Sequence, residues 1–341
     1  MELNTKEFQE ALKIVKPGLA RTELINQSTD YAFRNGRIIT YNDEISISHP
    51  VNSLDVTGVV EALTLYNYVT RLKRETMTIK TTSEEMQITC GKSKVGIPLM
   101  EEILLPLDQI DEVKEWFSIT EDFVTILNMA SGATAQDLNM GVFTCVYYNK
   151  DTKTITGSDN YRILHSDPLT VNGKVGSFLV PAKSAHLVPT IIPNKIAVTE
   201  SWVHFKNERG TIMSCRTVPD QYKDLSGVID NIEGQTFEFP RTMLEVIERA
   251  NIFSKKANTW EEEVQFTIAN NRITLRSQGD SGWFEESINH RYKDEPFSFS
   301  IIPYLLQDIL KRTSICTVSD HGLLFVGQGW RYISSLLSMK M

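Results

Sequence analysis

The sequence repeats one order of apolar patterns three times, and this internal repeat constrains the fold more than any other feature. Each copy opens with apolar residues at i, i+4 and i+7, which is the spacing of one buried face of an α-helix. The three patterns start 115 and 120 residues apart. A regular repeat of this kind predicts a tandem array of similar domains. The residues are Phe8, Leu12 and Val15 in the first copy, Phe123, Leu127 and Ala130 in the second, and Met243, Ile247 and Ala250 in the third.

The elements after this helix also recur in the same order. A short strand pair follows, and its isoleucines Ile38, Ile155 and Ile273 are offset by 117 and 118 residues. Each copy then has a second helical segment and closes with an alternating strand pair. The second helices are predicted over residues 59–72, 181–192 and 302–313, and the matching apolar positions of the closing strands are Met86 and Ile88, Val203 and Phe205, and Leu323 and Phe325.

Two prolines support this register, and a third indicates an irregular helix. Pro181 and Pro303 stand at the starts of two of the second helices, where the missing N–H costs little. Pro189 lies inside the middle helical segment. That helix is therefore predicted to be short or kinked.

The connections between the predicted strands are short, which indicates antiparallel pairing and an α+β fold. In each copy the two helices are expected on one face of the antiparallel sheets, where they bury one stripe of apolar residues. The copies are separated by acidic, poorly periodic segments around residues 101–116 and 226–237. The predicted domains are residues 1–115, 116–235 and 236–341.

Composition excludes several classes of protein. No apolar run approaches the roughly 18 residues of a membrane span, so no membrane association is expected. The four cysteines lie at least 55 residues apart, which argues against a zinc knuckle or a redox pair and indicates buried thiols in a reducing, cytoplasmic compartment. The net charge of −8 excludes a uniformly basic surface, although a local basic lining remains compatible with it.

No motif predicts catalysis, a metal site or a cofactor. The Gly91–Ser93 sequence GKS lacks the earlier glycine of a phosphate-binding loop and is interpreted as a strand edge. The six histidines form no HExxH pattern. Asp159 and Arg162 have no nucleophile or base at a matching spacing, so the simplest interpretation is a turn in which the Asp binds backbone amides and the Arg pairs with a carboxylate.

Ordered motifs along the whole chain resemble the bacterial replicative polymerase sliding clamp, the beta subunit of DNA polymerase III. The similarity is carried by TELINQSTDYAF after Arg21, TGSDNYRILHSD from Thr156, FLVPAKSAHL from Phe178, VPDQYKDL from Val218 and the C-terminal LLSMKM. Asn160 and Tyr161 replace the usual glycine and histidine of the family, and Ser338 replaces a proline. These departures indicate a divergent member, of bacterial or phage origin.

The resemblance implies a non-enzymatic ring, six domains in a head-to-tail homodimer, which encircles duplex DNA and tethers a DNA polymerase. A clamp loader would place it on DNA, without sequence preference. By resemblance, three groups of residues carry these roles. The expected DNA-facing residues are Arg21, Arg71, Lys73, Arg74, Lys183, Lys311 and Arg312; the expected partner-peptide cleft comprises Leu138, Tyr161, Arg162, Ile163, Pro219, Leu337 and Met339; the expected dimer contacts are Val95 and Ile97 with Ile252 and Phe253.

Two alternatives remain open from the sequence. A clamp-fold adaptor could bind replication proteins through the same cleft without encircling DNA. An enzyme with an unrecognised site would need a convergent polar constellation, and none is found. The first helix of the middle copy, EDFVTILNMAS, carries no Lys or Arg, which is the weakest point of the DNA-facing interpretation.

Overall fold

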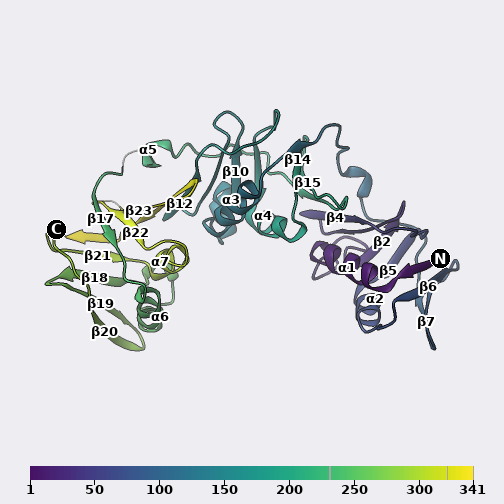
Figure 1. The fold of residues 1–341 in the computed structure, drawn as a ribbon, viewed down its shortest axis with the longest axis horizontal. Helices are drawn as coiled ribbons and strands as arrows, with labels where there is room; N and C mark the ends of the chain where they lie inside the picture. Colours follow the sequence, from purple (N-terminus) through teal and green to yellow (C-terminus); the bar gives the residue numbers. More distant parts are fainter. Residues whose placement is uncertain (230–231, 321, 341) are drawn as a thin grey trace. The chain divides into compact units, whose positions relative to one another are not determined.

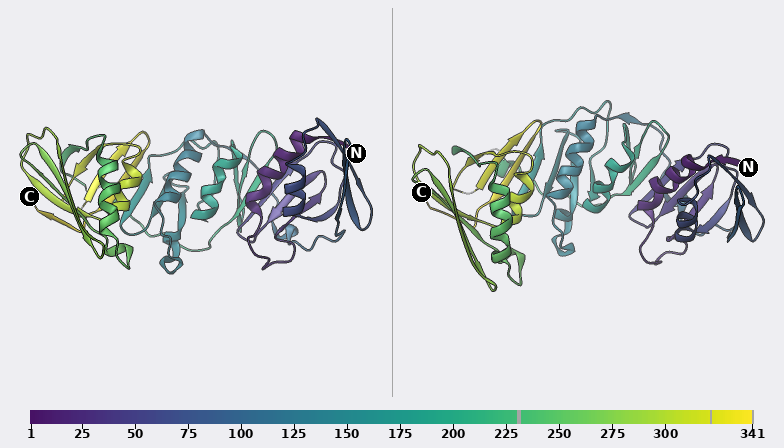
Figure 2. Two further views of the ribbon diagram at one scale, coloured as in Figure 1. Left: turned by 90° about the horizontal axis from the view of Figure 1, so that it is seen from below. Right: turned by 60° about the horizontal axis from the view of Figure 1, so that its bottom comes forward.

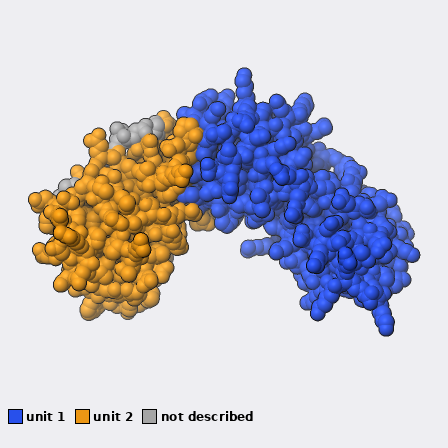
Figure 3. Space-filling model, viewed as in Figure 1, with its two compact units in different colours: residues 1–132, 145–153, 169–221 blue, residues 133–144, 154–168, 222–341 orange. Residues whose placement is uncertain are grey.

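The structure is a computed structural model that describes residues 1–229, 232–320 and 322–340. The chain forms two compact units, which Figure 3 shows in different colours. Their bounds are Met1–Gly132, Cys145–Lys153 and Leu169–Gln221 for unit 1, and Ala133–Thr144, Thr154–Pro168 and Tyr222–Met341 for unit 2.

One order of elements occurs three times along the chain: a strand, a helix, four strands, a second helix and three strands (Figure 1). The first copy consists of β1 (Glu2–Asn4), α1 (Thr5–Val15), β2 (Asp30–Arg34), β3 (Arg37–Tyr41), β4 (Ile45–Pro50), β5 (Gly58–Glu61), α2 (Ala62–Val69), β6 (Thr76–Thr81), β7 (Glu85–Cys90) and β8 (Ser93–Pro98).

The second and third copies follow the same plan. The second consists of β9 (Phe117–Ser118), α3 (Glu121–Gly132), β10 (Cys145–Asn149), β11 (Thr154–Ser158), β12 (Arg162–Ser166), β13 (Phe178–Pro181), α4 (Ala182–Leu187), β14 (Lys195–Val198), β15 (Trp202–Lys206) and β16 (Ile212–Arg216). The third consists of β17 (Gln235–Glu238), α6 (Met243–Ser254), β18 (Val264–Ala269), β19 (Arg272–Gly279), β20 (Gly282–Asn289), β21 (Phe297–Ile301), α7 (Pro303–Ile309), β22 (Ile315–Val318), β23 (Gly322–Gly327) and β24 (Trp330–Ser335), with a last strand β25 (Ser338–Lys340).

Short segments connect these elements. They are the 3-10 turns η1 (Lys16–Gly18), η2 (Leu107–Gln109), η3 (Leu138–Thr144), η4 (Val188–Ile191) and η5 (Thr259–Glu261), and one turn of helix, α5 (Ser226–Ile229).

The first helix of each copy is α1, α3 or α6, and the sequence periodicity predicted its buried face correctly. All nine residues of the i, i+4, i+7 patterns are buried, each at 1% exposure or less. The N-terminus of α1 is stabilised by Asn4, whose side chain accepts a hydrogen bond from the backbone N–H of Glu7 at 3.1 Å. Helices α1 and α2 pack side by side and cover one face of the sheet that contains β2–β5 (Figure 2).

The second helices are shorter than their predicted ranges. Val59 and Val60 lie in β5, so α2 begins at Ala62, because these valines pair with β2 as part of the sheet. Helix α4 ends after six residues and continues as η4, which contains Pro189, so the predicted short or kinked helix is confirmed. Helix α7 starts at Pro303 as predicted and ends at Ile309.

Within each unit, the strand pairs of the described residues are antiparallel, which confirms the α+β class. Unit 1 contains the sheets β1-β6-β7-β8 and β5-β2-β3-β4-β16-β15-β14-β9, and β10 pairs with β13. Unit 2 contains β11-β12-β24-β23-β22-β17 and β20-β19-β18-β21-β25.

Two strand pairs join successive copies of the repeat. Strand β4 of the first copy pairs with β16 of the second, and β12 of the second copy pairs with β24 of the third. Each copy has two halves, which in the first copy are β1–β4 with α1 and β5–β8 with α2. At both junctions the last strand of one copy's first half pairs with the last strand of the next copy's second half. The corresponding strands β8 and β20 lie at sheet edges.

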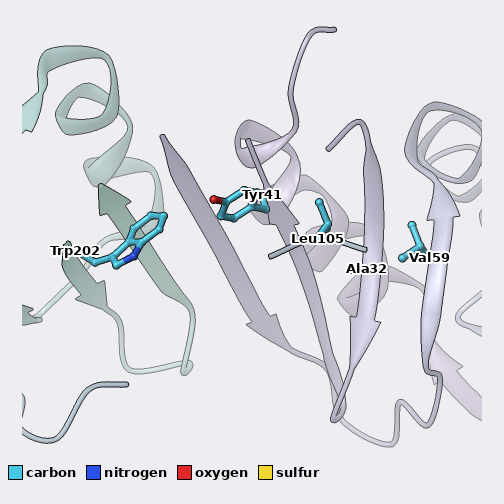
Figure 4. Packing of buried hydrophobic residues seen from close by; sticks show 5 residues of the cluster. All are labelled: Ala32, Tyr41, Val59, Leu105 and Trp202. Carbon is cyan, nitrogen blue, oxygen red and sulfur yellow. The ribbon is translucent and has the colours of Figure 1, made fainter. Parts of the chain in front are cut away.

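The connector between the first two copies packs on the sheet face opposite α1 and α2. Leu105 lies in one buried cluster with Tyr41 of β3 and Trp202 of β15, whose ring centroids are 6.3 Å apart (Figure 4). Ala32 and Val59 complete this cluster from β2 and β5. The indole N–H of Trp202 donates to the carbonyl of Gln109, which ties the connector to the sheet.

Several smaller predictions can also be compared with the fold. The four cysteines are buried free thiols, as predicted. Gly91 and Lys92 form the turn between β7 and β8, so the GKS sequence is part of a hairpin, in agreement with the interpretation as a strand edge. None of the helices in the described ranges is long and apolar enough to cross a membrane. The division at residues 115 and 235 stays a prediction.

Candidate functional site

Unit 2 contains a cavity of about 330 Å³ over the junction of β12 and β24. We call it the β12–β24 cavity. Ile163 and Ile333 lie directly opposite each other on the two strands and belong to one buried cluster with Ile229 of α5. The connector between the second and third copies therefore forms one side of an apolar cavity. The lining residues are Asn160, Tyr161, Arg162, Ile163, Gly227, Val228, Ile232, Ile333 and Ser335.

The turn between β11 and β12 is built around the carboxylate of Asp159. Its Oδ1 accepts hydrogen bonds from the backbone N–H groups of Tyr161 and Arg162, at 3.0 and 2.9 Å. Asn160 has φ 73°, in the left-handed region where glycine and asparagine are favoured. This backbone requirement explains how Asn160 can replace the glycine that the resemblance led us to expect. The predicted Asp-centred turn is confirmed.

Arg162 is a buried cation that connects β12 to α7. Its Nε donates to Asp159 Oδ2 at 3.0 Å, and its Nη1 donates to Asp308 Oδ2 at 3.0 Å. The guanidinium also lies 4.9 Å from the ring centroid of Tyr304. Burial alone would lower the pKa of Arg162, but Coulombic interactions with Tyr332 and Asp159 outweigh it and raise the pKa. The group is permanently charged, which suits anchoring and excludes a role as a proton carrier.

An aromatic stack borders the same turn. The rings of Tyr161 and Trp260 are parallel within 15°, with centroids 4.5 Å apart, and Trp260 also meets Tyr304 edge-on. Burial raises the pKa of Tyr304, and the neighbouring Asp159 adds to the shift. The Tyr304 hydroxyl donates a hydrogen bond to Asp159 Oδ2 at 3.2 Å. Sequence reasoning missed Trp260 because nothing in its local spacing points to Tyr161, 99 residues earlier.

The structure brings only some of the expected cleft residues together. Tyr161, Arg162 and Ile163 line the β12–β24 cavity. Leu138 lies on η3 and is 76% exposed, while Leu337 donates its backbone N–H to the carbonyl of Ser300. Leu138, Leu337 and Met339 are outside the cavity's lining, and Pro219 belongs to unit 1. The rest of the lining comes from Asn160 and from residues that the sequence did not single out, namely Gly227, Val228, Ile232, Ile333 and Ser335.

The expected DNA-facing residues are all exposed and lie at or near helix ends. Arg21 follows η1, Lys183 lies in the first turn of α4, and Lys311 comes after α7. The Nζ of Lys311 lies 3.7 Å from Oδ1 of Asp308. The others follow the same pattern. Arg71, Lys73 and Arg74 come after α2, and Arg312 comes after α7.

The expected dimer contacts lie on or beside edge strands. Ile97 of β8 is buried and Val95 is partly buried. Ile252 near the end of α6 is 61% exposed. Phe253 stacks on Phe284 of β20, with ring centroids 6.1 Å apart and planes within 15°. Within the described part of the chain, no group of three or more His, Cys, Asp or Glu side chains could hold a metal ion.

The chain has the fold of the bacterial DNA polymerase III beta sliding clamp. The solved beta chain from Streptococcus pneumoniae TIGR4 has a TM-score of 0.85 and 18% sequence identity, and the match covers 98% of each chain. A sliding clamp from Bartonella birtlesii bound to griselimycin has a TM-score of 0.85 and 15% identity over 99% of this chain and 98% of that one. The beta subunit from Thermotoga maritima has a TM-score of 0.81 and 18% identity, with 98% of each chain covered. Neither a protein-family model nor a curated protein matches the chain.

Proposed function

We propose that this protein is a DNA sliding clamp, a non-enzymatic ring that encloses duplex DNA and tethers a DNA polymerase to it. The observation that carries the proposal is the match to beta subunits of DNA polymerase III over 98% of the chain. The ring would hold DNA by topology and would need a clamp loader to open it, but no cofactor. It would act where the DNA is replicated, in the cytoplasm of a bacterium.

Two copies of the chain would close the ring head to tail, each supplying the three domains 1–115, 116–235 and 236–341. The pairing of β4 with β16 and of β12 with β24 supports this arrangement. Strand β20 corresponds to β4 and β12, strand β8 corresponds to β16 and β24, and both β20 and β8 lie at sheet edges. Apolar edge strands invite further pairing. Pairing β20 with β8 of a second copy would repeat the same junction and leave neither of these two strands at an open edge.

The repeat also predicts the register on β20. At the first junction, Ile45 of β4 lies opposite Cys215 of β16. Ile38 and Ile273 are equivalent repeat positions, and they lie opposite His49 of β4 and Ile288 of β20 respectively. Ile288 therefore occupies the position of His49. Four residues earlier on each strand, Phe284 occupies the position of Ile45.

The same reasoning applies to β8. Val203 and Met86 are equivalent, and they lie opposite Cys215 and Ile97 respectively. Ile97 therefore occupies the position of Cys215, so Phe284 of one copy would lie opposite Ile97 of the other. Phe253, stacked on Phe284, would extend this apolar seam.

The DNA-facing surface would consist of the seven exposed basic residues at the helix ends. Such side chains attract phosphates without reading bases, because a Lys or Arg contact to the backbone carries no sequence information. The β12–β24 cavity would receive an apolar segment of the polymerase or the loader. Its apolar floor supports this use. A solved clamp from Bartonella birtlesii is bound to griselimycin, so we propose griselimycin as the probe for the β12–β24 cavity.

The test is retention on DNA of different topology. The protein is loaded by a clamp loader onto nicked circular plasmid and passed through a gel-filtration column before and after a single restriction cut. A ring stays on the circle, also at salt that prevents direct binding, and slides off the linear form. Equal retention on both forms would refute encirclement and support the adaptor instead.

A further inference from the structure

Unit 1 has a second cavity at the other junction of the repeat. It has a volume of about 400 Å³ and lies over β4 and β16, and we call it the β4–β16 cavity. Like the β12–β24 cavity, it lies between a strand junction and the connector that joins two copies. The connector contributes Leu107, Ile110 and Val113, and Trp116 lies at its end. The two cavities therefore occupy equivalent positions in the repeat.

The floors of the two cavities differ at equivalent positions. Ile163 and Ile333, which lie opposite each other in the β12–β24 cavity, correspond to Ser46 and Ser214, which lie opposite each other here. His204, which also lines this cavity, is equivalent to Leu324, which packs against the Ile163–Ile333 cluster. The β4–β16 cavity thus combines a polar floor with apolar walls, so it would select a different ligand.

The polar groups of this floor already have partners within the fold. Ser46 Oγ donates to the carbonyl of Thr40 at 3.0 Å, and His204 Nδ1 lies 2.8 Å from Ser214 Oγ. Asp111, the acidic residue of the wall, accepts the backbone N–H of Ser201 at 3.0 Å. None of these groups requires a ligand.

Arg37 is the exception. It lines the cavity, is partly buried, and donates to Ser48 Oγ, to the Ser48 carbonyl and to the Gly210 carbonyl. All three acceptors are neutral, and no carboxylate within the described ranges forms an ion pair with Arg37. The neighbouring Arg34, in contrast, is paired with Asp108 at 2.9 Å. Nη1 of Arg37 therefore remains available to a carboxylate that enters the cavity.

Arg37 is partly buried as a charged group, and a carboxylate ligand would offset the free-energy cost of that desolvation. Desolvation lowers the pKa of Arg37, so the surroundings disfavour its charge without a negative partner. The walls offer apolar contacts from Ile39 and Ile212 on the sheet, as well as from the connector. A second positive charge is near, since Lys206 Nζ lies 5.4 Å from the ring centroid of Trp116.

We propose that the β4–β16 cavity is a second protein-binding site, which takes a short extended peptide with a carboxylate side chain between two apolar ones. The carboxylate pairs with Arg37, and the apolar side chains pack against Ile39, Ile110 and Trp116. The site differs from the β12–β24 cavity in its need for an acidic residue. It does not depend on whether the protein encircles DNA.

The test is isoleucine methyl NMR on the full chain, because Ile39, Ile110 and Ile212 report on this cavity and Ile163 and Ile333 on the other. The probe is acetyl-Ile-Glu-Phe-amide, compared with its Gln counterpart. We expect the Glu peptide to shift the first group of methyl signals, and the Gln peptide to bind about tenfold more weakly. Arg37→Gln should cause the same loss, with no further loss for the Gln peptide.

Two variants keep the test decisive. Arg272→Gln removes an exposed arginine of β19 in unit 2 and should leave peptide affinity unchanged. Val113→Glu adds a negative charge to the cavity wall without touching the Arg37 hydrogen bonds, and should weaken the Glu peptide more than the Gln peptide. The proposal is overturned if the peptide shifts only Ile163 and Ile333, if it shifts no methyl signal, or if Glu and Gln peptides bind equally well.

Discussion

Nη1 of Arg162 donates to Oδ2 of Asp308 at 3.0 Å, and this ion pair joins a strand of the second repeat copy to a helix of the third. The two residues are 146 positions apart in the chain. Asp308 is 57% exposed, whereas Arg162 and its other partner, Asp159, are buried. The two carboxylates should therefore contribute very differently to stability.

Replacing the arginine should be costly. Arg162→Ala leaves the carboxylate of Asp159 buried without its cation, which typically destabilises a protein by about 3–5 kcal/mol. Asp308→Ala breaks the pairs that the half-exposed Asp308 makes with Arg162 and Lys311, leaves Arg162 paired with Asp159, and should cost under about 1 kcal/mol. The free energy of unfolding in urea measures both. As a control, Arg272→Ala on β19 should change it by less than about 0.5 kcal/mol, and equal effects of Arg162→Ala and Arg272→Ala would contradict this account.

The proposed dimer seam can be tested by a charge at either phenylalanine. Phe284→Asp or Phe253→Asp should produce monomers, because a carboxylate would be buried against Ile97 of the other copy; the expected loss is about 3 kcal/mol or more of dimer stability. Light scattering gives the mass. Ile315→Asp changes an exposed isoleucine of β22 away from the seam and should leave the dimer intact. An unchanged mass for both seam variants would refute the assignment.

Griselimycin is proposed above as a probe of the apolar β12–β24 cavity, and its affinity should respond to substitutions in that cavity. Val228→Asp puts a charge on the connector wall, at a half-exposed residue whose replacement spares the core. Affinity, measured by calorimetry, should fall about tenfold or more, since the ligand would have to desolvate a carboxylate. Val326→Asp on β23 is the matched control, because Val326 is also exposed but does not line the cavity. Equal affinities of the two variants would count against the cavity.

Direct DNA binding should be weak and should fall steeply with salt. The slope of log affinity against log salt is expected to shrink by about 0.9 for each phosphate that the triple variant Arg71→Glu, Lys73→Glu and Arg74→Glu no longer neutralises. Filter binding over a salt series gives the slope. The pair Lys150→Glu and Lys174→Glu, two exposed lysines outside the proposed surface, should preserve it. A slope unaffected by the triple variant would remove these residues from the DNA-facing set.

His204 predicts a loss of stability in acid. Burial lowers its pKa to about 4, below the ordinary value of 6.5. The unfolded chain therefore takes up a proton below pH 6.5 that the folded chain refuses until about pH 4. Stability should fall as the pH drops through this window, by about 3 kcal/mol from this residue. Unfolding free energies of the wild type and His204→Leu at pH 7 and pH 4 should differ in their pH dependence by that amount, and parallel profiles would contradict the assignment.

The sequence by itself determined the two helices of each copy and the threefold order of the repeat, but it predicted only two strand pairs per copy, where the repeat as the structure describes it has eight strands. Helical and strand periodicities are local, so the buried faces of α1, α3 and α6 and the apolar positions of β7, β15 and β23 could be predicted from spacing alone. The turn at Asp159 was also local, since all its backbone hydrogen bonds span two or three residues. The resemblance to the clamp fold rested on the order of such local motifs.

Only the tertiary structure decided which residues share a site. Ile163 meets Ile333, and Ser46 meets Ser214, because β12 pairs with β24 and β4 with β16 in a particular register. A cross-strand neighbour 170 residues away, as Ile333 is from Ile163, leaves no periodic signal in the chain. The stack of Trp260 on Tyr161 has the same origin. Burial likewise sets the state of charged and titratable groups, because desolvation depends on what the fold places around a side chain rather than on its neighbours in sequence.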